Sequence, residues 1–325
     1  MNSQLPGPAH YPQITPQNAW RTHQIGLIRC AFIAALRWSA DGCLLAVAHG
    51  NGVWIWRDAL DAEPHLTLPS PDCPVKGIAF HPRTRLIATA SADAIVRLWN
   101  MNSGQCRSTI AGLEHGAEAL AFHPEGHLLA IGGIDGILRL LDLKSGSRAL
   151  LEGHQDEITA LAFTPDGMLI SASRDGTVRL WRPTPQSPRW FVVRMIWRHE
   201  DWVRDLSLNE AATLMATACK DGTTHLFALP DQQRIHVIEA HEGGCDAAAL
   251  SADGAVLASG GRDARVRLWD TTSGTLLAEL DGHTRPVLTA GFNPAGTLLI
   301  TGSGDNSLRI WAAGDDRSST ASPAD

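Results

Sequence analysis

The sequence contains little that would place the chain in a membrane or cross-link it. None of its apolar runs approaches the roughly 20 residues of a membrane-spanning helix, and its first residues have neither a basic start nor an apolar run. Its six cysteines include no Cys-x-x-Cys pair, so neither a disulfide framework nor a zinc site is indicated. These absences predict a soluble, cytoplasmic protein with reduced thiols and no membrane partner.

A basic surplus and the common catalytic motifs are also missing. The chain of 325 residues carries 27 Lys and Arg against 34 Asp and Glu, a net charge of -7, which disfavours nucleic acid as the main partner. It contains no Gly-x-Ser-x-Gly nucleophile elbow and no Gly-Lys dipeptide that could begin a phosphate-binding loop. The sequence therefore predicts no cofactor, no bound metal and no enzymatic activity.

What the sequence does contain is a repeat. The segment FTPDGMLISASRDGTVRLW at 163–181 has counterparts on both sides. Each copy consists of short apolar segments separated by turn signals such as Asp175-Gly176, so each is predicted to form the strands of one small sheet. Sheets stacked radially would cover one another's faces, which predicts an all-β fold with a single seven-bladed β-propeller. The seven copies end at residues 56, 99, 141, 181, 227, 269 and 311.

This pattern resembles the WD-repeat family of β-propellers, although the Trp-Asp dipeptide itself occurs only at Trp269-Asp270. The resemblance implies that an N-terminal strand closes the ring, with residues 18–28 paired to the outer edge of the last blade. The propeller is predicted to span residues 17–312. Residues 1–16, which are rich in proline, and residues 313–325 are predicted to be disordered tails.

Histidine, serine or threonine, aspartate and tryptophan recur at fixed places in the repeats. A Ser-His-Asp set could indicate a hydrolase, but a catalytic serine needs one exposed and activated copy rather than several in mid-strand. The family resemblance instead implies that the four residues form a hydrogen-bond chain that joins the strands of one blade. We expect three complete structural staples: His154, Ser171, Asp175 and Trp181; His241, Ser259, Asp263 and Trp269; and His283, Thr301, Asp305 and Trp311.

The other repeats lack members of this chain. The fifth keeps His199, Thr217 and Asp221 but ends in Phe227, which has no indole donor. The second keeps Thr89, Asp93 and Trp99 but has no histidine, and the first and third repeats lack more members. We expect apolar packing to hold blades one to three, and we expect this half of the ring to be less rigid.

Two further clusters could carry chemistry. The second positions of the innermost strands would lie near one mouth of the central channel, where charges of both signs are expected to neutralise one another rather than to catalyse a reaction. The channel positions are Lys76, Glu118, Thr159, Arg204 and Asp246.

The HPEGH segment at 123–127 has two histidines four residues apart, but they lie in a predicted turn, so a solvated turn is preferred over a metal site.

An arginine recurs two residues before the final aromatic position of most repeats. These arginines could form a basic ring for nucleic acid, but we prefer aliphatic stems packed between blades with the charged heads reaching solvent. The positions are Arg97, Arg139, Arg179, Arg267 and Arg309.

The face formed by the Gly-His loops and the aspartate turns is where the family resemblance implies partner binding. Arg174, Lys220 and Arg262 precede the turn aspartates of blades four to six, and Trp202 and Arg285 are expected on the same face. Trp and Arg are frequent anchors of interfaces, although acidic neighbours make an ordinary mixed-charge surface the alternative. The sequence thus favours a monomeric, non-enzymatic protein-interaction scaffold that binds an acidic or phosphorylated peptide segment. An RNA-binding propeller and a propeller enzyme with a site at the channel mouth remain the alternatives.

Overall fold

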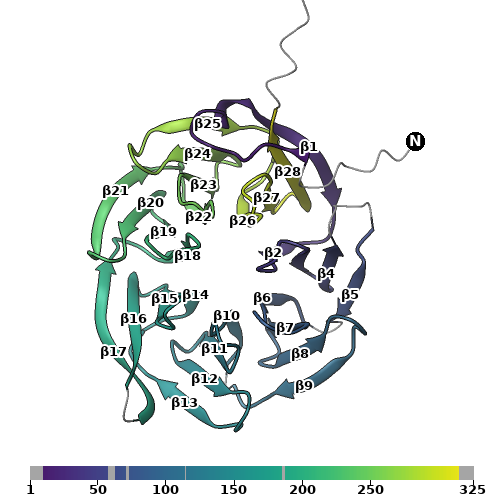
Figure 1. The fold of residues 1–325 in the computed structure, drawn as a ribbon, viewed down its shortest axis with the longest axis vertical. Coiled ribbons are helices and arrows are strands. Elements are labelled where there is room, and N and C mark those ends of the chain that lie inside the picture. Colours follow the sequence, from purple (N-terminus) through teal and green to yellow (C-terminus); the bar gives the residue numbers. More distant parts are fainter. Residues whose placement is uncertain (1–9, 58–62, 71–72, 114, 185–186, 315–325) are drawn as a thin grey trace, which may run out of the picture.

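The computed structural model of the chain is a ring of seven four-stranded antiparallel sheets, here called blades, around a central channel (Figure 1). It describes residues 10–57, 63–70, 73–113, 115–184 and 187–314, without the side chains of 183–196. The predicted all-β, seven-bladed propeller is confirmed. None of the helices in these ranges is long and apolar enough to cross a membrane.

Blades one to six are built in chain order from the channel to the rim, whereas the outer strand of blade seven is the first strand of the chain (Figure 1). A short 3-10 helix η2 (Ala19–Arg21) precedes that strand. Blades one to three consist of β2 (Ile33–Trp38), β3 (Leu44–His49), β4 (Gly52–Arg57) and β5 (Leu66–Pro69); β6 (Val75–Phe80), β7 (Leu86–Ser91), β8 (Val96–Asn100) and β9 (Cys106–Ile110); and β10 (Ala117–Phe122), β11 (Leu128–Gly133), β12 (Leu138–Asp142) and β13 (Arg148–Leu151). Blades four and five consist of β14 (Ile158–Phe163), β15 (Leu169–Ser173), β16 (Thr177–Thr184) and β17 (Ser187–Arg198); and β18 (Val203–Leu208), β19 (Leu214–Cys219), β20 (Thr223–Ala228) and β21 (Gln233–Glu239). Blades six and seven consist of β22 (Cys245–Leu250), β23 (Val256–Gly261), β24 (Val266–Asp270) and β25 (Leu276–Leu280); and β26 (Val287–Phe292), β27 (Leu299–Ser303), β28 (Ser307–Ala313) and β1 (Thr22–Arg29).

The apolar core lies between adjacent blades. The second strand of a blade is buried along its whole length in β3 and β23, because neighbouring sheets cover both of its faces. One cluster joins Leu226 of blade five to Leu257 and Trp269 of blade six. This arrangement explains why the strand segments are apolar without clean alternation.

The aspartate turns are tight hairpins that bring successive blades into contact. Between β15 and β16, an oxygen of Asp175 accepts the backbone N–H of Thr177 (2.9 Å), and Gly176 has a left-handed φ of 73°. A Cβ at Gly176 would lie 3.1 Å from the carbonyl oxygen of His199 in the next blade's loop. Glycine therefore meets both a conformational and a steric requirement here.

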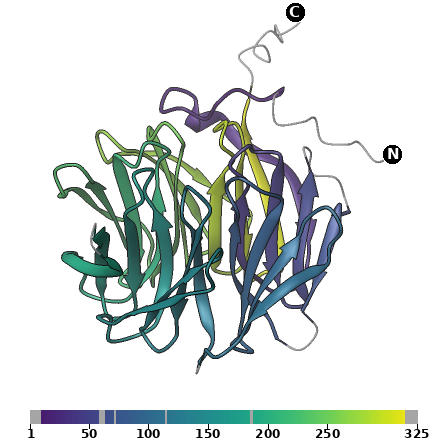
Figure 2. The same ribbon diagram turned by 60° about the horizontal axis from the view of Figure 1, so that its bottom comes forward.

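The ring closes through the N-terminal strand. β1 pairs antiparallel with β28, from Thr22 opposite Ala313 to Arg29 opposite Ser307. The last blade thereby gains its fourth strand and loses an exposed edge. Figure 2 shows the segment before β1 lying over the end of this blade.

The N-terminal segment is packed further upstream than the sequence analysis predicts. Ile14 is fully buried in the core cluster of blades six and seven, and its backbone N–H donates to the carbonyl of Gly296 (2.8 Å). Gln13 donates from Nε2 to Asp253 (2.7 Å). The prediction of a tail up to residue 16 is therefore wrong for this part. Ala313, placed in the second predicted tail, is buried in β28, and 1–9 and 315–325 lie outside the described residues.

Candidate functional site

In blade four the expected polar residues form one hydrogen-bond chain. The indole N–H of Trp181 donates to Ser171 Oγ (2.8 Å), Ser171 Oγ contacts His154 Nε2 (2.7 Å), and His154 Nδ1 contacts Asp175 (2.9 Å). Because the indole is only a donor and the carboxylate only an acceptor, the hydroxyl donates to Nε2 and the histidine donates from Nδ1. Ser171 is fully buried, so it cannot contact a substrate as a hydrolytic serine would.

Blades six and seven contain the same chain. His241 contacts Asp263 (2.9 Å) and Ser259 (2.8 Å), and His283 contacts Asp305 (3.0 Å) and Thr301 (2.8 Å). Trp269 and Trp311 donate to their hydroxyls at 2.8 and 2.9 Å.

The electrostatics of these chains fit a neutral histidine beside an ionised aspartate. Burial lowers the pKa of His154, against the opposing effect of Asp175. Burial alone would raise the pKa of Asp305, but hydrogen bonds from Ser307 and His283 bring it down to about 2. The chains are therefore ionised in one fixed pattern at neutral pH.

Blade five has the residues but not the chain. Both ring nitrogens of His199 and the hydroxyl of Thr217 are buried without a hydrogen-bond partner among the described residues. Asp221 accepts instead from the backbone and hydroxyl of Thr223 (2.8 and 2.6 Å). The ring of His199 lies against that of His225, with centroids 4.3 Å apart.

The recurring arginines correct one expectation. Their charged heads do not extend into solvent, because in four blades the guanidinium lies beside the aspartate four residues earlier, on the same hairpin. Sequence reasoning missed this pairing, although the regular four-residue spacing of Asp and Arg was a usable signal. The nearest N···O distances are 2.6 Å for Arg97–Asp93, 2.6 Å for Arg139–Asp135, 3.8 Å for Arg179–Asp175 and 2.6 Å for Arg267–Asp263. In the last blade, Arg309 donates to the carbonyl of Gly282 and to Gln24.

On the face of the aspartate turns, three cations surround one indole ring. Lys220 Nζ lies 4.1 Å from the centroid of Trp202, and the guanidinium carbons of Arg174 and Arg204 lie 5.1 and 5.2 Å from it. These residues come from the turn after β15, the start of β18 and the turn after β19. The structure thus brings together three residues of the predicted surface with Arg204, which sequence reasoning assigned to the channel alone.

Acidic residues are interleaved with these cations. Arg174 pairs with Glu157 (2.7 Å), Lys220 with Asp201 (3.6 Å), and Arg262 with Asp246 (3.1 Å). Asp246 also lies 3.6 Å from Arg204, which joins Arg262 to the group around the indole ring. Arg285 is exposed, and no ion pair found among the described residues includes it. We call Arg174, Trp202, Arg204, Lys220 and Arg262 the Trp202 surface.

A carboxyl pair lies beside the Trp202 surface. Burial and then the neighbouring Glu118 raise the pKa of Glu157 to about 8. Arg174 contacts both carboxyl groups, at 2.7 Å from Glu157 and 3.9 Å from Glu118. The raised pKa of Glu157 weakens the hold of this carboxyl group on Arg174.

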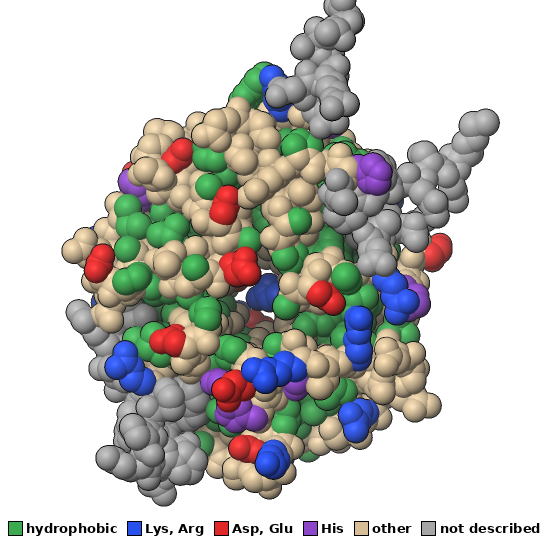
Figure 3. Space-filling model, in the orientation of Figure 1, with side chains coloured by type: hydrophobic (Ala, Val, Ile, Leu, Met, Phe, Trp, Pro, Cys, Tyr) green, Lys and Arg blue, Asp and Glu red, His purple; other side chains and the backbone are tan. Residues whose placement is uncertain are grey.

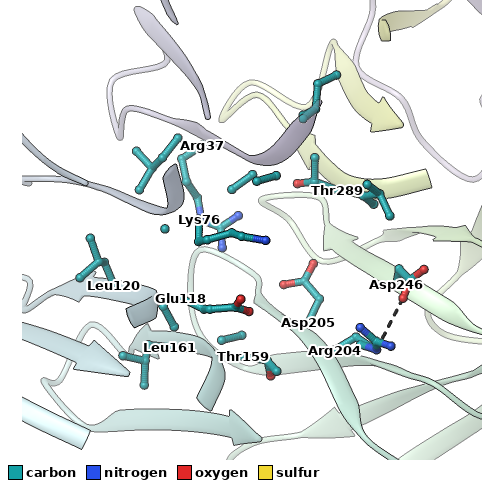
Figure 4. A pocket seen from close by; sticks show the side chains of 18 of the residues that line it. Arg37, Lys76, Glu118, Leu120, Thr159, Leu161, Arg204, Asp205, Asp246 and Thr289 are labelled. Carbon is teal, nitrogen blue, oxygen red and sulfur yellow. Dashed lines mark ion pairs between the residues drawn. The ribbon is translucent and has the colours of Figure 1, made fainter. Parts of the chain in front are cut away.

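The channel positions lie where the sequence places them, and two further charges join them. Lys76, Glu118, Thr159, Arg204 and Asp246 line one mouth of the channel (Figure 4). Arg37 and Asp205 line it as well, at the fifth and third positions of their strands. Sequence reasoning missed both, because each innermost strand has a register shift after its first residue that alternation alone does not reveal.

The HPEGH turn is the one candidate metal cluster in the described part of the chain. The ligand atoms of His123, Glu125 and His127 lie within 4.8 Å of one another. In the view of Figure 3, histidine side chains gather beside acidic and basic ones over β10–β12. However, His123 Nδ1 already accepts the backbone N–H of Glu125 (3.1 Å), and its Nε2 packs against Gly167 of the next blade.

The equivalent histidine of blade two makes similar contacts. His81 Nδ1 accepts the N–H of Arg83 (3.1 Å), and its Nε2 contacts the carbonyl of Gly126 (3.0 Å) in the next blade's turn. The position of His123 is therefore explained by the contact between successive turns. The preferred interpretation of the HPEGH segment as a solvated turn stays in place, since Glu125 is exposed.

The ring of seven sheets, the hydrogen-bond staples and the charged turn face define a β-propeller whose distinctive surface is a rim rather than a cleft. The chain belongs to the family described as "WD domain, G-beta repeat". The family model matches residues 62–100, 104–142, 146–182, 191–227, 232–270 and 274–312.

Curated relatives match parts of the chain. The chain is 29% identical over 247 residues to the nuclear distribution protein PAC1 of Fusarium vanettenii, covering 64% of this chain and 54% of that protein. It is 29% identical over 232 residues to nuclear distribution protein PAC1-2 of Uncinocarpus reesii, covering 60% and 50%. It is 28% identical over 128 residues to human apoptotic protease-activating factor 1, covering 39% and 10%. The chain thus spans about half the length of the PAC1 relatives that it matches.

Proposed function

We propose that this protein is a non-enzymatic interaction scaffold that binds an acidic or phosphorylated segment of a partner protein through the Trp202 surface. The observation that carries the proposal is the indole ring of Trp202, which has Lys220, Arg174 and Arg204 within 5.2 Å of its centroid. These residues lie on turns of adjacent blades, so only the folded ring assembles them.

The indole acts here as a platform for cations. Aromatic faces attract ammonium and guanidinium groups by about 0.5–1 kcal/mol at exposed sites, which limits the rotamers of long side chains. Cations that are already ordered lose less entropy when an anionic partner binds. Guanidinium groups also form paired hydrogen bonds to carboxylate and phosphate. This refines the sequence-based hypothesis, in which Trp202 itself anchors the partner.

The interleaved acids determine what the partner must supply. Asp201 and Asp246 occupy part of the hydrogen-bonding capacity of Lys220, Arg204 and Arg262. A partner segment must therefore carry several anionic groups to compete with them. The name of one relative, apoptotic protease-activating factor 1, describes an action on another protein, which agrees with a scaffold function.

The test is a binding measurement with defined probes. We expect fluorescence anisotropy to show that a labelled octaglutamate peptide binds more tightly than octaglutamine, and that R174E/K220E/R262E weakens binding by about tenfold or more. The control is R57E/R83E/R85E, which reverses three exposed arginines outside the Trp202 surface. Equal weakening by the two triple variants would overturn the proposal.

Two further arms distinguish the chemistry of the partner. An octaphosphoserine peptide compares phosphate with carboxylate, and a labelled oligouridylate tests the RNA-binding alternative. Asp246→Asn should strengthen octaglutamate binding, because it frees both Arg204 and Arg262. Tighter binding of the RNA, or an unchanged affinity of D246N, would argue against an acidic protein segment as the partner.

A further inference from the structure

Two cations inside the channel have no acidic group within ion-pair distance among the described residues. Arg37 of β2 donates one guanidinium N–H to the carbonyl of Leu36 (2.9 Å). The ammonium group of Lys76 in β6 lies 5.6 Å from the ring of Phe32. Both line a cavity of about 230 Å³ at the mouth of the channel, and Figure 4 shows their side chains directed toward its centre.

The acids that line the same cavity are already engaged. Asp246 pairs with Arg204 (3.6 Å) and Arg262 (3.1 Å), and Glu118 lies beside Arg174 (3.9 Å). Each of these two acids therefore has at least one cation within ion-pair distance, although Arg174 lies closer to Glu157 (2.7 Å).

Asp205 is satisfied by the backbone. One of its oxygens accepts the N–H of Leu206 (2.9 Å) and the other accepts the N–H of Ala248 (3.2 Å). Burial also raises its pKa, against the opposing effect of Arg37. Arg37 therefore acts on Asp205 from beyond ion-pair distance, and among the described residues that line the cavity four cations face three acids.

The remaining wall supplies space and a hydroxyl. Thr289 of β26 is buried and lies on the side of the cavity next to Arg37 and Lys76 (Figure 4). Ala35 and Gly77, which also line the cavity, are too small to fill it. Arg37 and Lys76 are both half-buried beside this space, so an anion bound between them would compensate for the part of their hydration that is lost.

We propose that the channel mouth binds a small oxyanion, a carboxylate or a phosphate group, between Arg37, Lys76 and Thr289. This site goes beyond the proposed function, because its principal cations are not part of the Trp202 surface and its ligand need not come from the same partner. The guanidinium group of Arg37 can donate two parallel hydrogen bonds, and the Lys76 ammonium and the Thr289 hydroxyl can each donate to a single oxygen. This set of donors suits the oxygens of a carboxylate or of a phosphate.

The test compares thermal unfolding in increasing inorganic phosphate with unfolding in chloride at equal ionic strength. We expect the wild type to show a saturable increase in melting temperature, and R37Q/K76Q to lose it. Phosphate also stabilises proteins by exclusion from their surface, but that effect is shared by all variants and does not saturate. The matched control R83Q/R85Q, which removes two exposed arginines in the turn after β6, should respond like the wild type. An equal response of wild type and R37Q/K76Q would overturn the proposal.

Further variants and probes distinguish the possible reasons for a negative result. If R37Q/K76Q does not fold, the single variants K76Q and T289V replace it, each with a weakened response expected. A Gly-Gly-Glu-Gly-Gly peptide compared with its glutamine form tests a carboxylate presented by a partner, whereas inorganic phosphate tests a free ion. K220E/R262E changes two cations of the Trp202 surface that do not line the cavity, so its response to phosphate should equal that of the wild type, and failure of this site and failure of the Trp202 surface can be told apart.

Discussion

Blade four and blade five have a histidine, a hydroxyl residue and an aspartate at equivalent positions, yet only blade four joins them by hydrogen bonds. The residue that differs is the last of the set, Trp181 in blade four and Phe227 in blade five. Without an indole donor, Thr217 and both nitrogens of His199 are buried without partners among the described residues. The comparison indicates that the chain behaves as a unit that depends on the indole N–H.

Blade five compensates with aromatic packing. Trp197 of the neighbouring blade stacks on Phe227 with centroids 3.8 Å apart, and His225 occupies the position that an arginine has in blade four. This packing buries rings, but it leaves the polar groups of His199 unsatisfied, which costs stability. The two blades therefore reach similar geometry by different balances of polar and apolar contacts.

The largest effect is expected when blade seven, which has a complete staple, loses its outer strand. Blade seven has the chain of His283, Thr301, Asp305 and Trp311, and its fourth strand is β1. Deleting residues 1–29 removes that strand and exposes the edge of β28, so we expect aggregation or loss of the folded monomer in size-exclusion chromatography.

The matched truncation is smaller. Deleting residues 1–16 removes the buried Ile14 but keeps β1, so we expect a folded protein that is less stable by about 2–4 kcal/mol in urea unfolding. If both truncated proteins were folded monomers of equal stability, closure by β1 would not be important.

The aspartates of blades four and five should contribute differently to stability. Asp175 accepts from His154 (2.9 Å) and from the backbone of Gln155 (2.9 Å), whereas the contacts of Asp221 are to Thr223. D175A should lower the free energy of unfolding by about 2–4 kcal/mol, because it leaves buried partners unpaired, and D221A by about 1 kcal/mol. If urea titrations gave equal losses of unfolding free energy for D175A and D221A, the hydrogen bond between His154 and Asp175 would not contribute to stability.

The repeated features of this fold could be predicted from the sequence, because each was present several times. Seven copies in phase predict seven sheets, and the absence of a fourth strand after Trp311 predicts closure by the N-terminal segment. The three staples have the expected hydrogen bonds, since their four residue types occur at constant spacing. Each copy of the repeat can be compared with the other six, so a residue type that recurs at one position is easily recognised.

The features that were missed depend on contacts that the spacing of residue types does not reveal. Ile14 lies alone in a proline-rich segment, so no periodicity marked it as buried. Arg37 and Asp205 reach the channel because a register shift changes which residues of the innermost strands face it. The group around Trp202 depends on the contact of loops from adjacent blades, a distance relation that sequence spacing does not contain.

A smaller effect is expected when the hydroxyls are exchanged. Ser171 both accepts from Trp181 and contacts His154, so S171A should cost about 1–3 kcal/mol. The buried hydroxyl of Thr217 has no hydrogen-bond partner among the described residues, so the isosteric T217V should be neutral or slightly stabilising. Urea unfolding of both variants gives the comparison, and a large loss in T217V would mean that its hydroxyl has a role in solution.

The smallest effect concerns pH, where the two blades should again differ. Burial lowers the pKa of His199 to about 3, with His225 and Arg234 acting in the same direction and Asp221 against them. Burial likewise lowers the pKa of His225 to about 4. An unfolded histidine has a pKa of about 6.5, so below that value the unfolded state binds protons that the folded state does not. The stability associated with these two residues is fully present above about pH 6.5 and is lost as the pH falls toward their folded pKa values.

Replacing one of these histidines by a ring that cannot be protonated isolates the effect. Between about pH 7 and about pH 5.5, H199F should gain about 1 kcal/mol relative to the wild type, because it no longer favours the unfolded state in acid. The matched variant H154F should be destabilised throughout this range, because it breaks the chain of Ser171 and Asp175. Urea titrations at the two pH values test this. A stability difference between H199F and the wild type that stays constant with pH would show that His199 is already hydrogen-bonded or hydrated in solution, and blade five would then differ from blade four only in the residue that completes its chain.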